Sequence, residues 1–157
     1  MAKKHDLRIQ RVGTVINGIS SKQEKLLLKA IQRVSESLFK RFPGISLEWE
    51  QNLKLVDVIK ALKLHFPHVS FASPLKTSAM KPDGGFLYII SKDGNRYPVL
   101  ITEKKNQGTN DLRAKEGKKK QSKGNAIERL GKNVIGLRTA LLNENIFPFI
   151  CFGDGCD

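Results

Sequence analysis

The sequence predicts an α/β domain in which helices flank a mixed β-sheet, with an α+β domain as the alternative. Apolar residues recur at helical spacing in three segments, an Asp-Gly turn joins two strongly β-forming segments, and a further apolar stretch lies near the C-terminal end. With 157 residues and 39% hydrophobic content, the chain is long enough to bury the core of one domain. No internal repeat or linker divides it, so we expect a single domain over residues 1–157.

The first predicted element is an amphipathic helix. Ser21 and Glu24 form a capping-box pattern, and the apolar residues that follow recur every three or four positions. A helix is therefore expected from Ser21 to about Arg41. The sequence Phe42-Pro43-Gly44 ends it.

A strand, a second helix and a loop are expected next. Residues 45–49 alternate between apolar and polar, which predicts a half-buried strand. Residues 55–62 return to helical spacing, and Pro67 closes that helix. Residues 69–79 contain proline and several hydroxyl residues, so we expect a loop with at most one short strand.

The most regular part of the chain is a predicted β-hairpin. Residues 86–90 are aromatic and β-branched, residues 92–95 carry the Asp-Gly turn signal, and residues 97–102 form the returning strand. These two strands should be antiparallel neighbours.

The C-terminal third begins with a polar segment. Residues 106–123 lack apolar periodicity, which predicts an exposed arm. A helix is expected from about Gly124 to Asn143, and residues 146–152 are expected to form a buried final strand.

The chain is strongly basic. Its formal net charge is +13 and its pI is about 9.9, which favours a polyanionic partner such as DNA, RNA or an anionic membrane face. Between Glu103 and Lys132, ten Lys or Arg stand against four Asp or Glu, a net charge of +6. This concentration favours a binding face, and a solvated basic loop is the alternative.

Composition also limits location and redox chemistry. No segment approaches the roughly 20 apolar residues that span a membrane, and the start lacks a secretion signal, so a cytoplasmic protein without membrane contact is expected. Cys151 and Cys156 are too few for a disulfide framework, and with three histidines in the chain they are poor candidates for a zinc site. We expect both cysteines to be reduced thiols.

Two acids and a lysine are candidates for metal-dependent chemistry. Asp83 stands just before the first hairpin strand and Glu103 just after the second, so their carboxylates should converge at the open end. Two carboxylates suit Mg²⁺, which prefers oxygen ligands and retains several waters. Lys105 is two residues from Glu103, so the two side chains share one face of a strand, and its ammonium can orient a water or stabilise a phosphate. These parts suit phosphodiester hydrolysis, and ordinary turn and surface chemistry is the alternative.

Three blocks of sequence carry a resemblance. They are KPDGG at residues 81–85, EKKNQG at residues 103–108, and GNAIER at residues 124–129 followed by Lys132-Asn133. In this order they resemble the EcoRI family of type II restriction endonucleases, over nearly the whole chain. The resemblance implies a restriction-endonuclease-like PD-(D/E)xK core in which Asp83 and Glu103 bind metal and Lys105 is the catalytic lysine. It also implies that the carbonyl of Lys104 is a further metal ligand.

The predicted helix that begins near Gly124 has side chains suited to DNA bases. Asn125 can bond adenine, Ala126 can touch a thymine methyl, and Arg129 can donate to a purine edge. The alternative is that Asn125 caps the helix and that Glu128 and Arg129 are solvated. The resemblance implies that this block contacts the inner AATT of a site, and that Glu128 and Arg129 couple two half-sites across a homodimer.

The basic arm completes the predicted DNA surface. The side chains assigned to DNA binding in it are those of Lys118, Lys119, Lys120 and Lys123. Lys123 replaces a small residue of the resembled family, and the arm is shorter and richer in lysine. The resembled family also continues past the last residue of this chain, so the C-terminal part of the family's domain is expected to be missing here.

The function expected from these features is that of a type II restriction endonuclease. It would use Mg²⁺ to cleave double-stranded DNA at a palindrome with an AATT centre, similar to GAATTC, leaving 5′-phosphates. A homodimer and a cognate DNA methyltransferase are the expected partners. The alternatives are a catalytically inactive, truncated DNA-binding remnant and a basic RNA-binding protein.

Overall fold

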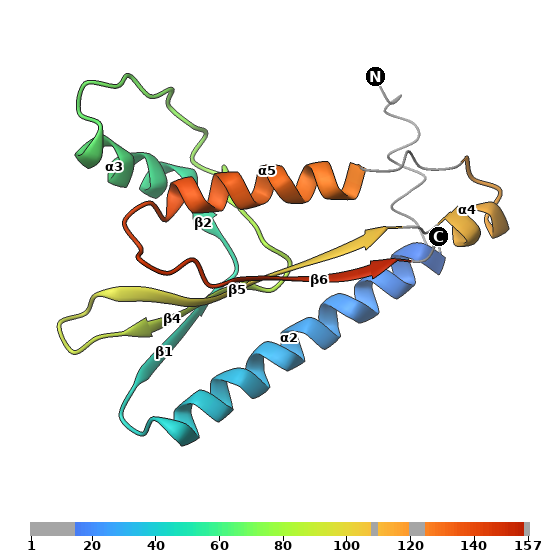
Figure 1. The fold of residues 1–157 in the computed structure, drawn as a ribbon, viewed down its shortest axis with the longest axis horizontal. Coiled ribbons are helices and arrows are strands. Elements are labelled where there is room, and N and C mark those ends of the chain that lie inside the picture. Colours follow the sequence, from blue (N-terminus) through green and yellow to red (C-terminus); the bar gives the residue numbers. More distant parts are fainter. Residues whose placement is uncertain (1–14, 108–109, 120–124, 156–157) are drawn as a thin grey trace.

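A four-stranded mixed sheet organises the fold of this computed structural model, which describes residues 15–107, 110–119 and 125–155 (Figure 1). Its strand order is β1 (Ser46–Glu50), β4 (Gly85–Ile90), β5 (Arg96–Gln107) and β6 (Phe149–Gly155). The first three are antiparallel neighbours, whereas β5 and β6 are parallel. The predicted hairpin and the predicted mixed sheet are therefore confirmed.

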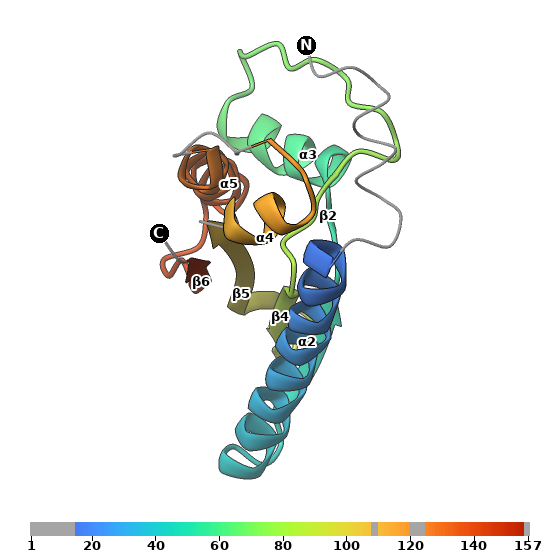
Figure 2. The same ribbon diagram turned by 90° about the vertical axis from the view of Figure 1, so that its right-hand side faces the viewer.

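Helices lie on both faces of this sheet, as the α/β class requires. α2 (Val15–Arg41) lies on one face, and α5 (Asn125–Ala140) lies on the other with α3 (Leu55–His65) beside it (Figures 1 and 2). A short helix, α4 (Asn110–Lys115), follows β5.

A second, two-stranded sheet joins the segments on either side of α3 and its loop. It pairs β2 (Leu53–Lys54) with β3 (Ala79–Met80) in antiparallel fashion. The expected loop over residues 69–79 is thus confirmed, with one short strand at its end.

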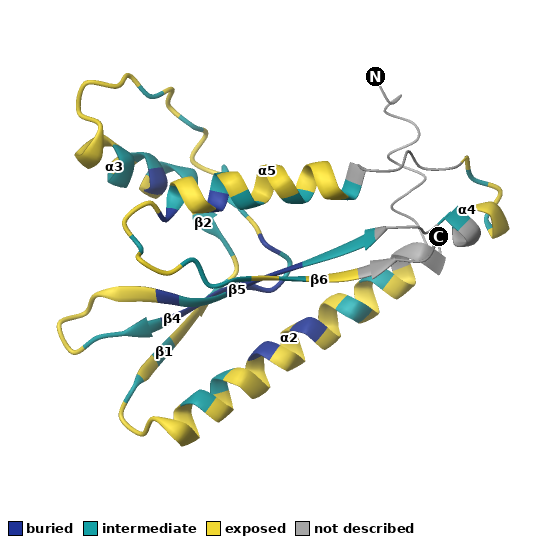
Figure 3. Cartoon of the chain, in the orientation of Figure 1, coloured by how far each residue is buried: buried dark blue, intermediate teal, exposed yellow. Residues whose placement is uncertain are grey.

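The main core lies between the sheet and α5. Phe86 and Tyr88 of β4 and Ile101 of β5 pack with Leu137 and Leu141 of α5, and all five are buried (Figure 3). Phe86 and Tyr88 are two positions apart, as residues on one face of a strand are, and Leu137 and Leu141 are four positions apart, as residues on one side of a helix are.

The opposite face of the sheet is covered more thinly. Among the α2 side chains that the structure describes, from residue 18 on, the buried apolar ones are Leu27 and Ile31, four positions apart on one side of the helix, and most of the others are exposed (Figure 3).

The N-terminal helix begins earlier than the sequence indicates. Ser21 lies inside α2, so the capping-box pattern does not mark the start of the helix. Ser20 donates a hydrogen bond to Oε1 of Glu24 at 3.2 Å, one helical turn along. Both residues also contact Lys104 of β5, and this contact with a distant strand stabilises the extra turns.

The segment expected to be an irregular arm is partly regular. Asn106 and Gln107 continue β5, where they pair with Asp154 and Gly155 of β6, and α4 follows. The prediction failed here because parallel pairing with a strand more than forty residues away leaves no local pattern in polar residues.

The final strand differs from the prediction in place and in burial. It begins at Phe149, and within the described part of the chain its one neighbour is β5. The expectation of a buried strand over residues 146–152 is wrong, because Ile146, Ile150 and Phe152 are exposed at this edge. The preceding helix ends at Ala140 rather than Asn143, and its predicted first residue, Gly124, lies outside the described residues.

Within the described ranges, no helix combines the length and the apolar character that crossing a membrane requires.

Candidate active site

Asp83 is held by a tight turn between β3 and β4. The amide of Gly85 donates to the carbonyl of Pro82 at 3.0 Å, and Gly85 adopts a φ of +74°, a conformation that glycine tolerates best. The indole N–H of Trp49 donates to the carbonyl of Gly84 at 2.9 Å. The Pro-Asp-Gly-Gly sequence thus forms a turn fastened to two strands, with Asp83 at its tip.

The two predicted carboxylates meet, as the hairpin geometry indicates. The backbone amide of Asp83 donates to Oε2 of Glu103 at 3.0 Å, and the backbone amide of Lys104 donates to Oδ2 of Asp83 at 3.0 Å. Glu103 is buried, with 2% of its surface exposed. Each acid therefore accepts a backbone hydrogen bond from the segment that carries the other.

Lys105 shares the face of Glu103, as the two-residue spacing predicts. Its ammonium contacts Oε1 of Glu103 and remains partly exposed. The amide of Asn133 in α5 donates to the same Oε1 at 2.9 Å. A buried carboxylate needs such partners, because an unpaired buried charge is strongly destabilising.

Asn133 is a site residue that the sequence did not assign. It belongs to the Lys132-Asn133 pair that follows the GNAIER block, and its place on the predicted helix gave no indication that it reaches the acid pair.

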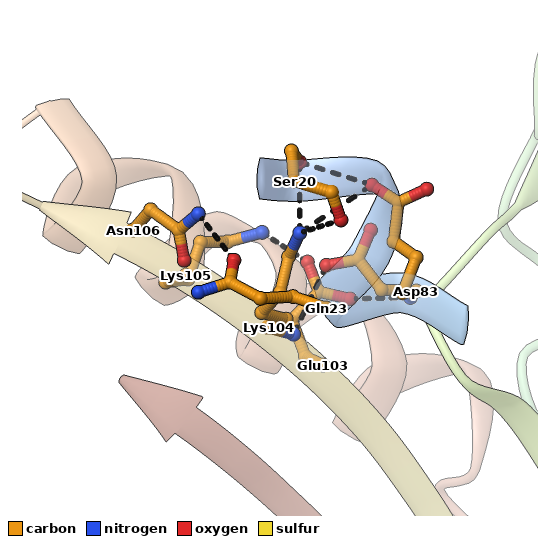
Figure 4. A network of polar contacts seen from close by, with 8 residues as sticks. Ser20, Gln23, Asp83, Glu103, Lys104, Lys105 and Asn106 are labelled. Carbon is orange, nitrogen blue, oxygen red and sulfur yellow. Dashed lines mark hydrogen bonds and ion pairs between the residues drawn. The ribbon is translucent and has the colours of Figure 1, made fainter. Parts of the chain in front are cut away.

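The alternate residues of β5 point to the opposite face and hold α2. The ammonium of Lys104 donates to Oγ of Ser20 at 2.8 Å and to its carbonyl at 3.0 Å, and it lies 3.4 Å from Oε1 of Glu24. The amide of Asn106 donates to Oε1 of Gln23 at 2.8 Å. Figure 4 shows these side chains reaching from the strand to one end of α2.

Burial affects the acid and thiol groups of this region. Desolvation raises the pKa of Asp83, and the hydrogen bond from the Lys104 amide opposes that change. Desolvation also raises the pKa of the thiol of Cys151, a β6 residue that lies opposite Glu103 in the register of β5 and β6. Cys151 is a free cysteine, whereas Cys156 lies outside the described residues.

The predicted base-contacting residues lie at the start of α5. Asn125 is its first residue, and the side chain of Asn125 lies outside the described part. Ala126 is partly buried and Arg129 is exposed. Glu128 accepts a hydrogen bond from Lys132 at 2.6 Å, which lowers the pKa of Glu128. Within this helix Glu128 therefore pairs one turn along rather than with its neighbour Arg129.

Two lysines of the basic arm are described, and their surroundings differ. Lys118 donates to Oε2 of Glu116 at 2.6 Å and is partly buried, whereas Lys119 is exposed. Lys120 and Lys123 lie outside the described residues.

A family comparison connects this geometry to known proteins. The sequence model described as restriction endonuclease EcoRI matches residues 9–157. The chain belongs to the EcoRI family of restriction endonucleases. Its mixed sheet with flanking helices is consistent with the restriction-endonuclease-like fold of that family.

Two curated members of the EcoRI family are similar in sequence. The type II restriction enzyme RsrI of Cereibacter sphaeroides is 30% identical over 163 residues, and the type II restriction enzyme EcoRI of Escherichia coli is 28% identical over 162 residues. Each alignment covers 98% of this chain and 52% of the relative. The chain therefore spans about half the length of the curated relatives it matches.

The acid pair has the composition of a site for the divalent metal that restriction endonucleases generally use. Asp83 and Glu103 supply carboxylate oxygens, and Lys104, whose carbonyl is the third candidate ligand, directly follows Glu103 in sequence. Among described residues there is no group of three or more His, Cys, Asp or Glu that could hold a metal ion. A set of two carboxylates and a carbonyl fits Mg²⁺, which retains several waters, better than it fits zinc.

Proposed function

We propose that this chain carries the DNA-cleaving core of a type II restriction endonuclease. Its substrate is double-stranded DNA with a palindromic site that has an AATT centre, similar to GAATTC. Cleavage uses Mg²⁺ and leaves 5′-phosphates, two copies of the chain act as a homodimer, and a cognate DNA methyltransferase protects the host.

The convergence of Asp83, Glu103 and Lys105 carries this proposal. Hydrogen bonds join the segments of the two acids, and the lysine ammonium contacts the second acid from the same face of β5. The relatives named above are type II restriction enzymes, which supports cleavage of DNA over other phosphodiester chemistry.

Each residue of the site has a distinct part in the proposed reaction. Asp83, Glu103 and the carbonyl of Lys104 would hold Mg²⁺, which would polarise the phosphoryl group and stabilise charge on it. Lys105 orients the attacking water and stabilises negative charge on the phosphate. The water oxygen attacks phosphorus in line with the 3′-oxygen, a P–O bond to the water forms as the P–O3′ bond breaks, and a proton passes from the water to the leaving oxygen, which gives a 5′-phosphate and a 3′-hydroxyl.

The start of α5 supplies recognition in this proposal. Asn125, Ala126 and Arg129 contact base edges in the major groove, and Glu128 and Arg129 link the two half-sites across the dimer. The lysines of the arm, Lys118, Lys119, Lys120 and Lys123, contact the phosphate backbone, which contributes affinity without sequence information.

Cleavage of short duplexes tests the proposal. Purified protein with Mg²⁺ is incubated with duplexes that contain GAATTC or CAATTG, and with a duplex in which the central AATT is scrambled. We expect 5′-phosphate products from an AATT duplex, none from the scrambled duplex, and none when EDTA replaces Mg²⁺. Random nicking of all three duplexes, or no cleavage, contradicts the proposed enzyme.

A second candidate function is that of a DNA-binding protein without nuclease activity, which the net charge of +13 also favours. Gel shifts separate the candidates: preference for AATT duplexes without cleavage favours the DNA-binding protein, and preference for RNA hairpins favours an RNA-binding protein.

A further inference from the structure

One contact joins the proposed recognition helix directly to the acid pair. The side-chain amide of Asn133 in α5 donates to Oε1 of Glu103 at 2.9 Å. The remaining contacts of this carboxylate come from the Lys105 ammonium and the backbone of Asp83, both of which belong to the hairpin region. Among these partners, Asn133 is thus the one that α5 contributes.

The contact also fixes how α5 lies along β5. Ile101 shares a core cluster with Leu137 and Leu141, and two residues farther along β5, Glu103 meets Asn133, four residues nearer the start of α5. The helix and the strand therefore run in opposite directions, in agreement with Figure 1.

The two elements advance by matching steps. Four helical residues rise about 6 Å, and two strand residues rise about 6.6 Å. Extended by one more step, the same spacing would place Arg129 level with Lys105. A shift of α5 along its axis would change the level of Arg129 and the position of the Glu103 carboxylate together.

We propose that Asn133 is a positioning residue that couples DNA recognition by α5 to the metal-binding carboxylate of Glu103. The proposal rests on the proposed function of α5. It assigns to Asn133 the orientation of a metal ligand, which is a role that hydrogen-bonded partners of metal ligands commonly have. Asn133 itself contacts neither the metal nor the scissile phosphate in this proposal.

Metal binding to the protein without DNA tests the positioning role. Ca²⁺, which also prefers oxygen ligands, is titrated calorimetrically into the full chain and its variants. Asn133→Ala should weaken Ca²⁺ binding about ten-fold, because loss of such a partner typically costs 10–100-fold in metal affinity. Asn133→Gln keeps an amide donor and should recover part of that loss.

A matched control removes an asparagine that lies away from the site. Asn143 is exposed just beyond the end of α5, so Asn143→Ala should leave Ca²⁺ affinity unchanged. Equal Ca²⁺ affinity in the wild-type protein and Asn133→Ala, or an equal loss in both alanine variants, overturns the positioning role.

The coupling is measured by repeating the titrations with DNA. An AATT duplex should tighten Ca²⁺ binding to the wild-type protein about five-fold or more relative to a scrambled duplex, within the usual range of coupling between two sites. Recovery of uncut DNA afterwards verifies that binding alone is measured. In Asn133→Ala the duplex should still bind, but the tightening should disappear.

The outcomes separate this inference from the proposed function. If Asn133→Ala keeps the full tightening, the coupling role is overturned while recognition stands. If the Ca²⁺ affinity of the wild-type protein is the same with both duplexes, both the proposed recognition by α5 and the proposed coupling are overturned. The titrations without DNA still decide whether Asn133 positions Glu103.

Discussion

Replacing Gly84 with alanine tests how tightly the turn that carries Asp83 is packed against β5. A Cβ atom at this position would overlap Oγ1 of Thr102 and lie 2.6 Å from Cδ1 of Ile31. Thr102 is buried, and the amide of Gly84 donates to its carbonyl at 3.0 Å. Neither the turn nor the strand can move aside without loss of this hydrogen bond.

The expected cost follows from these contacts. Overpacking of a closely packed site costs about 1–3 kcal/mol, and loss of the hydrogen bond from Gly84 adds about 1 kcal/mol. Gly84→Ala should therefore lower the free energy of unfolding by about 2–4 kcal/mol. Urea denaturation followed by far-ultraviolet circular dichroism measures this change.

A second substitution isolates the steric cause. Thr102→Ala removes the overlapping Oγ1, which has no hydrogen-bond partner among the described residues, and leaves the Thr102 Cβ at 3.1 Å from the new atom. The double variant should therefore be more stable than Gly84→Ala alone. Such recovery is the non-additivity that residues in contact produce.

A glycine with open surroundings provides the control. Gly131 lies in α5 with nothing within 4 Å of an added Cβ, so Gly131→Ala should stabilise the protein by roughly 0.5–1 kcal/mol. The steric reasoning is refuted if Gly84→Ala changes stability by less than about 0.5 kcal/mol, the usual range for harmless surface changes. It is also refuted if Thr102→Ala gives no recovery.

Three further predictions concern charged groups. Lys104→Met removes the ammonium and its hydrogen bonds to α2, so the free energy of unfolding should fall by about 1–2 kcal/mol. An unchanged urea midpoint would contradict this role. The pKa of Asp83 is raised in the folded state, so Asp83 makes the metal-free protein less stable as pH rises through and above its unfolded value of 3.8. Asp83→Asn should therefore stabilise the protein at pH 7 in EDTA relative to pH 3, and an equal effect in urea titrations at both pH values would contradict the assignment. Lys119→Gln should reduce the slope of log affinity for duplex DNA against log salt concentration by about one. Lys118→Gln should change this slope less, because Lys118 is already paired with Glu116. Equal slopes for the two variants in gel shifts at several salt concentrations would exclude this difference.

The hairpin and the acid pair could be predicted because their signals are local. An Asp-Gly turn between β-forming segments fixes β4 beside β5, and Gly94 in that turn has a φ of +82°. Once the hairpin is set, Asp83 and Glu103 must meet at its open end, and the two-residue spacing places Lys105 beside Glu103.

The features that could not be predicted depend on contacts between distant segments. The start of α2 depends on the contacts of Ser20 with Lys104, 84 residues away in the chain. The hydrogen bond from Asn133 to Glu103 depends on how α5 lies on the sheet, which is set by packing at Leu137 and Leu141. No spacing within a single helix contains that information.

The alternation of β5 has a consequence for how this family can change over time. Glu103 and Lys105 face α5, whereas the side chain of Lys104 faces α2, so the central position of Glu-x-Lys contributes its backbone, and not its side chain, to the proposed site. Substitutions at Lys104 can therefore accumulate together with substitutions at Ser20 and Glu24, without altering the order or spacing of the acid and the lysine. The side chain at the middle of Glu-x-Lys can thus change together with α2 while the acid and the lysine of the motif are kept.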